Sequence, residues 1–331
     1  MIPRRGAALT GWGGALPATE VSNGRLSETL DTSDEWIYSR SGIRARRLAA
    51  GPLVAPDAGA GPDGVGTTAT LAIAAGRQAL ERAGLDGASV GMLLLCTTTP
   101  DQAMPGTAAA VAAALGITGG ALDLNAACAG FAYGLVVGAS LVSSGVEHVL
   151  LVGADTMSRV TNFADRSTAV LFGDGAGAVT LSATVPPSLL GWDTGVDGAL
   201  VSILYAPLGS GMVMKGQEVF RQAVRAARVS AINTLKQAGV TGDEVALFVP
   251  HQANSRIMAA LSDQVGIPPD RLASVVESTA NTGAASIPLA LADAADRGRL
   301  RPGDLVLFAG FGSGMTWATS LWQWTDSDAR C

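Results

Sequence analysis

The chain has 331 residues, of which 48% are hydrophobic, and it carries a formal net charge of −6 at pH 7. This length is enough for two domains or for one large α/β unit with a substantial core. The acidic balance argues against broad nucleic-acid binding, which requires a basic face. No uninterrupted apolar run is long enough to cross a bilayer. We therefore expect neither nucleic acid nor a membrane among the partners.

The cysteines indicate a reducing environment. Cys96, Cys128 and Cys331 give an odd number, and their spacing matches neither a disulfide framework nor a zinc motif. We therefore expect no metal site. No charged segment followed by a hydrophobic stretch opens the sequence, so we predict no secretion signal and expect the cytoplasm as the compartment.

Helical and strand-like patterns alternate along the chain, which is typical of an α/β protein. Residues 49–66 are rich in Pro, Gly and Ala and are expected to form an exposed loop. Apolar periodicity predicts helices at 68–83, 108–115, 130–143, 218–238, 255–265 and 287–296. Short apolar runs predict buried strands at 92–96, 149–152, 169–172, 178–181, 245–249 and 305–309.

The two parts of the chain share an outline. Each part has a long helix, a buried strand, a turn of small residues and a later Gly-rich turn before a strand, at 173–178 and at 310–315. We predict an internal duplication with halves 1–185 and 186–331. Both glycine runs lead into a strand rather than a helix. We therefore interpret them as close-packing turns and not as dinucleotide-binding loops.

Cys128 is the most informative single residue. It lies among small residues in the segment NAACAGF at 125–131, directly before the predicted helix 130–143. A helix N-terminus favours a thiolate, so we expect a lowered pKa for this thiol. Considered alone, such a cysteine is more often a small buried hydrophobic residue.

Two distant segments favour the catalytic interpretation. His251 follows the predicted strand 245–249, and Asn281 lies in a turn of small residues before the predicted helix 287–296. A cysteine, a histidine and an asparagine at the ends of elements form a constellation typical of nucleophilic catalysis. The other histidine, His148, is expected at the surface where a strand begins. Taken singly, His251 is more often structural and Asn281 more often a turn residue.

With these segments in view, the sequence resembles the β-ketoacyl-acyl-carrier-protein synthase III family of the thiolase superfamily nearly from end to end. The resemblance implies a thiolase-like fold with a duplicated, five-layered α-β-α-β-α architecture, and a homodimer. The motifs that carry it are DTSDEWI at 31–37, RSGI at 40–43, AACAGF at 126–131, DR at 165–166, FGDGAG at 172–177, VPHQAN at 249–254 and NTGAAS at 281–286.

The family pattern assigns roles to the three central residues. The resemblance implies Cys128 as the nucleophile, with His251 and Asn281 as donors to the oxygen of an enolate. We expect the backbone N–H groups of Cys128 and Ser313 to form an oxyanion hole, with an ordinary turn as the alternative for Ser313.

Further residues match positions that bind substrates in relatives. The resemblance places the coenzyme A nucleotide against Trp36, Arg40 and Arg166, which could instead be a buried anchor and structural ion pairs. It also implies that Arg221 and Arg256 dock the acidic acyl carrier protein. Ordinary solvation is the alternative for a surface arginine.

Three departures leave the acyl substrate open. Gly283 stands where the family often has Ser. Met104 occupies a position from which the partner subunit often closes the acyl pocket, frequently with Phe; interface packing is the alternative. The segment 200–214, which would border the acyl channel, is shorter than in common relatives. Phe311 matches a family aromatic residue near the thiol, either lining the pocket or packing in the core.

The resemblance implies a decarboxylative condensation. Cys128 would accept the acyl group of an acyl-CoA and pass it to a malonyl-carrier-protein thioester, starting a fatty acid or polyketide. Coenzyme A thioester would be a substrate, and no tightly bound cofactor is expected. The main alternative is a related acyltransferase that moves an acyl group to a hydroxyl or amine of a natural product. A non-catalytic partner subunit and a cysteine hydrolase are further alternatives.

Overall fold

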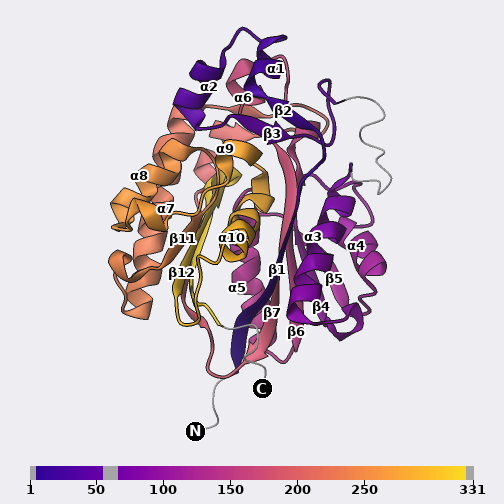
Figure 1. Cartoon of the computed structure of the whole chain (residues 1–331), viewed down its shortest axis with the longest axis vertical. Coiled ribbons are helices and arrows are strands. Elements are labelled where there is room, and N and C mark those ends of the chain that lie inside the picture. Colours follow the sequence, from indigo (N-terminus) through magenta and orange to yellow (C-terminus); the bar gives the residue numbers. More distant parts are fainter. Residues whose placement is uncertain (1–4, 55–65, 326–331) are drawn as a thin grey trace.

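Helices and sheets alternate in five layers across residues 5–54 and 66–325, which the computed structural model describes (Figure 1). Each of the two main sheets has one helical layer on its outer face, and a third helical layer lies between the sheets. The predicted α/β fold with an α-β-α-β-α architecture is thereby confirmed. No helix in the described ranges is long and apolar enough to cross a membrane.

The first sheet is built entirely from strands that precede residue 185. Its order is β1 (Gly6–Ala15), β7 (Asp174–Thr184), β6 (His148–Thr156), β4 (Met92–Cys96) and β5 (Gly120–Leu124). The neighbours β6, β4 and β5 run parallel, whereas β7 is antiparallel to both β1 and β6. Helices α3 (Thr68–Ala83) and α4 (Thr107–Leu115) pack on its outer face.

The second sheet is built from strands that follow residue 188. Its order is β11 (Leu247–Pro250), β12 (Leu305–Gly312), β13 (Thr316–Gln323) and β8 (Leu189–Val196). Only the pair β11 and β12 is parallel. Helices α7 (Gly216–Ala238) and α8 (Ser255–Val265) cover the outer face of this sheet.

Two helices form the middle layer, α5 (Gly130–Ser143) and α10 (Ser286–Asp296). They lie between the sheets in Figure 1, and one apolar core joins them to strands of both sheets. Close packing requires glycine here, since a Cβ at Gly177 would lie 2.7 Å from Cβ of Pro288. Residues 174–178 belong to β7 itself, so the first predicted Gly-rich turn is strand, although its close-packing role is as expected.

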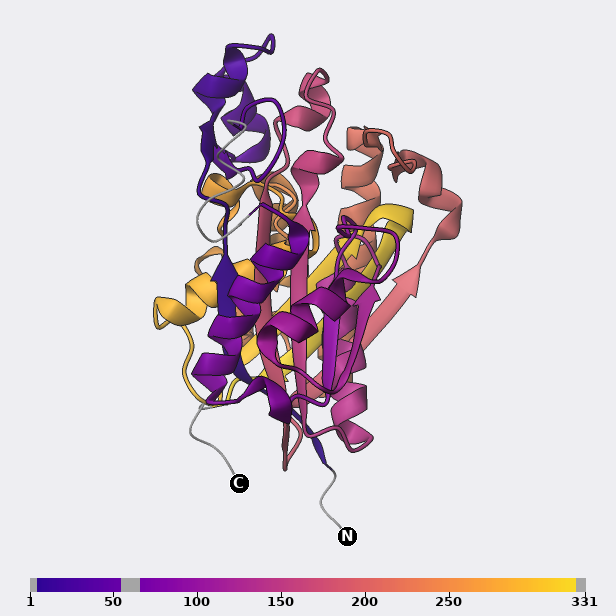
Figure 2. The ribbon, with the colours of Figure 1, turned by 90° about the vertical axis from the view of Figure 1, so that its right-hand side faces the viewer.

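Shorter elements form a cap over one end of the strands, and Figure 2 shows its N-terminal part in indigo above the sheets. The cap elements are β2 (Glu20–Ser22), α1 (Asn23–Ser27), α2 (Asp34–Ser41), β3 (Ala45–Arg47), α6 (Arg166–Ala169) and α9 (Val276–Thr279), and all of them except β3 contribute to one apolar cluster. A small hairpin of β9 (Leu204–Tyr205) and β10 (Val213–Met214) precedes α7.

Most predicted helices and strands are present, but one predicted strand is wrong. Residues 169–172 are not a strand: the short helix α6 ends at Ala169 and a turn follows. Asp165 begins this helix by accepting a hydrogen bond from the backbone N–H of Ser167. Val170 is buried in the apolar cluster of the cap, which explains the apolar run without a strand. Most of the predicted loop 49–66 lies outside the described residues.

Candidate active site

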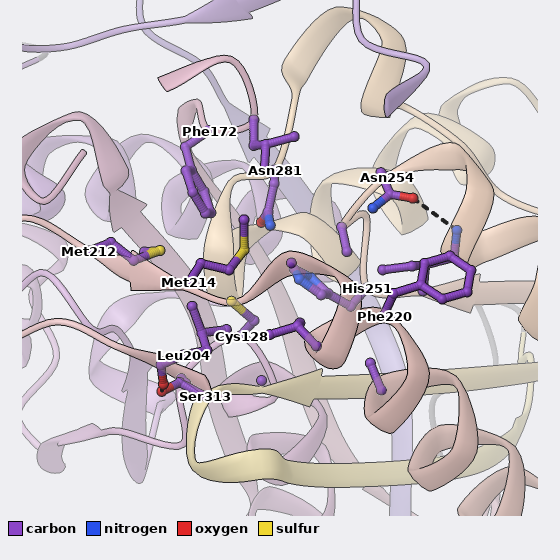
Figure 3. Close-up of a pocket in the computed structure, with 18 of the residues that line it drawn as sticks. Cys128, Phe172, Leu204, Met212, Met214, Phe220, His251, Asn254, Asn281 and Ser313 are labelled. Atoms are coloured by element: carbon purple, nitrogen blue, oxygen red, sulfur yellow. Dashed lines mark hydrogen bonds between the residues drawn. The ribbon is translucent and has the colours of Figure 1, made fainter. Parts of the chain in front are cut away.

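One cavity of about 1030 Å³ brings the predicted catalytic residues together. Cys128, His251 and Asn281 all line it, and their side chains point into the same space in Figure 3. The cavity also contacts Trp36 and Arg40 of the cap, so it leads from the protein surface to the thiol. The three groups therefore share a solvent-connected pocket rather than separate structural sites.

A tight turn positions Cys128 two residues before helix α5. Ala127 has a φ of 50°, which is uncommon for a residue with a Cβ. Hydrogen bonds from the N–H groups of Ala129 and Gly130 to the carbonyls of Ala126 and Ala127 close the turn. Such backbone strain is typical of functional sites, where the surrounding structure stabilises it.

The Cys128 thiol is not ionised by its surroundings in this structure. Its pKa is raised to about 12, chiefly by burial and to a smaller extent by the negative charge of Asp155. The expected lowering by the helix N-terminus is therefore wrong, because desolvation of the thiolate outweighs it. The side chain is only partly buried by area, since the cavity opens onto it.

His251 is held as a neutral imidazole. Its backbone N–H donates to the carbonyl of Ala309 at 2.8 Å, which continues the pairing of β11 with β12. Its Nδ1 atom lies 2.6 Å from Oγ of Ser286, and the Phe311 ring meets the imidazole edge to face at 5.1 Å. The ring is buried, and burial lowers the pKa of His251 to about 3.

Asn281 is oriented by its own backbone and by the next turn. Its N–H donates to the Leu171 carbonyl at 2.9 Å, and its carbonyl accepts from Gly173 at 3.0 Å. Its Oδ1 atom accepts from the N–H of Gly283 at 3.0 Å. Because the oxygen is occupied, the amide N–H groups of Asn281 are the part left for a substrate in the cavity.

The turn after β12 approaches the backbone of Cys128 closely. A Cβ at Gly312 would lie 2.7 Å from the backbone nitrogen of Cys128, so only glycine fits. Ser313 follows directly, lines the cavity, and donates its hydroxyl to the carbonyl of Leu204. This close approach is compatible with an oxyanion hole formed by the N–H groups of Cys128 and Ser313.

The predicted coenzyme A residues lie together at the cap. The guanidinium of Arg40 lies 4.5 Å from the centroid of the Trp36 ring, and that of Arg166 lies 4.9 Å from it. Trp36 and Arg40 line the cavity, whereas Arg166 does not and packs against the Trp36 ring. Arg166 also donates to the backbone carbonyl of Asp31 at 2.6 Å. Both arginines are exposed, so this stack is open to a flat ligand from solvent.

The remaining predicted residues divide into two groups. Arg221 of α7 and Arg256 of α8 are exposed and stand on the rim of the cavity, and Phe311 lines its interior. Met104 does not line the cavity of its own chain and is 84% exposed. A residue that closes the pocket of a second subunit must be exposed on its own chain, and Met104 meets this requirement.

Sequence reasoning missed Asp155, and of the hairpin β9–β10 it expected only that the segment 200–214 borders the acyl channel. Asp155, at the end of β6, is buried and accepts a hydrogen bond from Ala284, three residues after Asn281. Met212 and Met214, at the hairpin β9–β10, line the cavity near Cys128 (Figure 3). No local motif indicates these contacts, because each depends on segments that are distant in the sequence.

A cysteine at the start of a middle-layer helix, with neutral histidine and amide donors across a shared cavity, defines an acyl-transferring enzyme of the thiolase-like fold. Comparisons with known proteins narrow this class. Two models described as 3-oxoacyl-[acyl-carrier-protein (ACP)] synthase III match the chain, one at residues 122–198 and the C-terminal one at 235–324. The chain belongs to the β-ketoacyl-[acyl-carrier-protein] synthase III family and is an enzyme of that type.

Individual relatives cover nearly the whole chain. The β-ketoacyl-[acyl-carrier-protein] synthase III of Roseiflexus sp. (strain RS-1) is 41% identical over 96% of this chain and 98% of that protein. The Synechococcus elongatus protein of the same name is 42% identical over 97% and 98%. The crystal structure of the Aquifex aeolicus VF5 synthase III superposes with a TM-score of 0.90 at 37% identity, over 96% of this chain and 100% of that one. The priming β-ketosynthase of the R1128 polyketide pathway gives 0.89 at 35% identity, over 99% of both chains.

Proposed function

We propose that this chain starts fatty acid or polyketide synthesis by condensing an acyl group from acyl-CoA with a malonyl-carrier-protein thioester. The observation that carries this proposal is the convergence of Cys128, His251 and Asn281 on one cavity. A nucleophile alone would serve acyl transfer. Two neutral N–H donors beside the thiol suit a second step in which an enolate must be stabilised.

In the first half-reaction the sulfur of Cys128 attacks the thioester carbon of acyl-CoA. The tetrahedral oxygen is held by the backbone N–H groups of Cys128 and Ser313, which the glycine at 312 allows to approach each other. The carbon–sulfur bond to coenzyme A then breaks, and the proton lost by Cys128 leaves with the coenzyme A thiol. Because the thiol begins protonated, this proton transfer accompanies the attack.

In the second half-reaction the malonyl carboxylate leaves as carbon dioxide. The electron pair of the broken carbon–carbon bond passes into an enolate, whose oxygen accepts hydrogen bonds from His251 and Asn281. The enolate carbon attacks the acyl carbon on Cys128 and forms the new carbon–carbon bond. The thiolate that leaves takes up a proton from water, and the product is a β-ketoacyl thioester.

The partners follow from the same scheme. Coenzyme A thioester acts as a substrate, and the chemistry requires no resident cofactor. An acidic acyl carrier protein would meet Arg221 and Arg256 at the cavity rim. The working form is a homodimer in the cytoplasm, in which Met104 of one subunit closes the acyl pocket of the other; its 84% exposure supports this arrangement.

Incubation with acyl-CoA and malonyl-carrier protein tests the proposal. We expect a mass increase of one acyl group on Cys128 and then a β-ketoacyl-carrier product. Cys128→Ala should abolish both. His251→Ala and Asn281→Ala should retain acylation while condensation falls by about 10²–10³-fold, as for loss of an oxyanion donor. Acylation followed only by transfer to a hydroxyl or amine acceptor would contradict condensation and support the alternative acyltransferase.

A further inference from the structure

Ser286 makes the closest polar contact to the His251 ring. It is the first residue of α10 and is fully buried, 35 positions after His251 in the chain. Its Oγ atom lies 2.6 Å from Nδ1 of His251 and 3.3 Å from the backbone nitrogen of Gln252. These two contacts determine where the hydrogen atoms can be.

The donors and acceptors allow one fully satisfied arrangement. The N–H of Gln252 can only donate, so Oγ of Ser286 accepts from it. Within the described ranges, Nδ1 of His251 is the remaining hydrogen-bond partner of this hydroxyl. If the hydroxyl donates to Nδ1, every group is paired. If Nδ1–H donated instead, the buried hydroxyl hydrogen of Ser286 would lack an acceptor, which is unfavourable.

We propose that Ser286 is a positioning residue that holds His251 as the tautomer with its proton on Nε2. His251 then presents an N–H donor to the cavity, and it does not present a basic lone pair to the Cys128 thiol. The lowered pKa of His251 supports this assignment, since only a neutral ring has two tautomers to choose between. The proposal rests on the proposed function in one respect: the donor serves the enolate oxygen.

The second donor is oriented from the same short segment. Gly283 occupies Oδ1 of Asn281 through its backbone N–H at 3.0 Å, which leaves the amide N–H groups for the cavity. Ser286 lies three residues later and occupies Nδ1 of His251. Residues 283–286 therefore determine which atoms of Asn281 and His251 face the cavity as donors. Gly283 does so by occupying the acceptor oxygen of Asn281, and Ser286 by occupying the acceptor nitrogen of His251.

Nitrogen-15 NMR of the histidine side chains reads the tautomer directly in the full-length protein. The chain has only two histidines, so the spectrum contains two imidazoles. His148 is an internal reference, since its Nδ1 lies 2.9 Å from Oγ of Ser182 on β7 and it does not line the cavity. We expect protonated Nε2 and unprotonated Nδ1 for His251 at neutral pH. A His251 ring protonated on Nδ1 would overturn the proposal.

Variants then separate positioning from general structural support. In Ser286→Ala we expect the Nε2–H tautomer to lose its preference, decarboxylation and condensation to fall about tenfold, and Cys128 acylation to stay within about twofold. Ser286→Thr, which retains the hydroxyl, should keep the wild-type tautomer. Ser182→Ala removes the other histidine–serine contact and should change neither rate.

Two results for Ser286→Ala would each refute the proposal: an unchanged His251 tautomer, or equal losses in acylation and decarboxylation with a lowered melting temperature. Failure of the proposed function is distinguishable from both. In that case wild-type protein would not form a β-ketoacyl product, while the NMR spectrum would still report whether Ser286 selects the tautomer.

Discussion

The carboxylate of Asp155 accepts a 2.7 Å hydrogen bond from the backbone N–H of Ala284, across 129 residues of sequence. This bond ties the end of β6 in the first half to the segment that carries Asn281 in the second. The other oxygen of Asp155 accepts bonds from Thr97, Thr98 and Thr99. The position of Asn281, the proposed enolate donor, thus depends on the buried carboxylate of Asp155.

Replacing this carboxylate should affect condensation more than acylation. In Asp155→Asn an amide N–H₂ faces N–H and O–H donors, which should lower the free energy of unfolding by about 1–3 kcal/mol. A shift of the Asn281 segment should reduce condensation about tenfold or more. Urea denaturation and the two half-reaction assays measure these effects. The exposed Asp263→Asn is the control and should leave both unchanged. Equal losses in both half-reactions would contradict the assignment.

Gly283 should tolerate no side chain. Its φ is +60°, and a Cβ would lie 2.3 Å from Oδ2 of Asp155. Gly239 has a φ of +69° with open space around it, so Gly239→Ala isolates the backbone strain of about 1–2 kcal/mol. Gly283→Ala should lose a further 1–3 kcal/mol, roughly the cost of overpacking, together with condensation activity. Equal unfolding free energies in the two variants would show that the segment relaxes away from Asp155.

The raised pKa of Cys128 predicts a specific pH dependence. A thiol with a pKa of about 12 is protonated at neutral pH, and its thiolate fraction rises about tenfold per pH unit. The rate of alkylation by iodoacetamide should therefore increase steadily from pH 7 to 9 without a plateau. Peptide mass spectrometry follows Cys128 separately from Cys96, which is fully buried and should not react. A plateau near pH 7 would indicate an ionised resting thiol.

Local signals explain which elements the sequence predicts well. The helix 68–83 has the predicted ends, because Thr67 forms a capping box at its start and Gly84 adopts a left-handed conformation at its end. Strand β1, with the sequence GAALTGWGGA, is not predicted, because glycine and alanine have low strand propensity. It forms through pairing with β7, more than 160 residues away. Long-range pairing of this kind leaves no local pattern.

Some features of the site are likewise predictable from local sequence, and others are not. Cys128, His251 and Asn281 are recognisable because each stands at the end of an element among small residues. The contact between Ser286 and the imidazole depends on the approach of α10 to β11, which sequence spacing does not specify. The pKa of Cys128 is the clearest failure. The helix N-terminus is a local feature, but the opposing burial is a property of the assembled fold.

The ring of Trp36 should contribute directly to coenzyme A binding. Loss of stacking on a base costs about 1–3 kcal/mol, so Trp36→Ala should raise the dissociation constant for coenzyme A by roughly 5- to 150-fold. Calorimetric titration with coenzyme A measures it. Tyr38→Ala is a matched control, because Tyr38 also holds an arginine, Arg44 at 3.8 Å, but does not line the cavity. Equal affinities in the two variants would place the nucleotide elsewhere.

Arg221 at the cavity rim should affect the reaction with malonyl-carrier protein but not the reaction with acyl-CoA. Arg221→Glu places a negative charge where an acidic carrier protein would approach, so the KM for malonyl-carrier protein should rise about fivefold, close to 1 kcal/mol. The effect should shrink at high salt, because exposed charges are screened. Arg225→Glu, one turn further along the exposed side of α7 and away from the cavity, is the matched control. Acylation by acyl-CoA should be unchanged in both variants. If Arg225→Glu raised the KM as much as Arg221→Glu, the effect would reflect net charge rather than docking at the cavity rim.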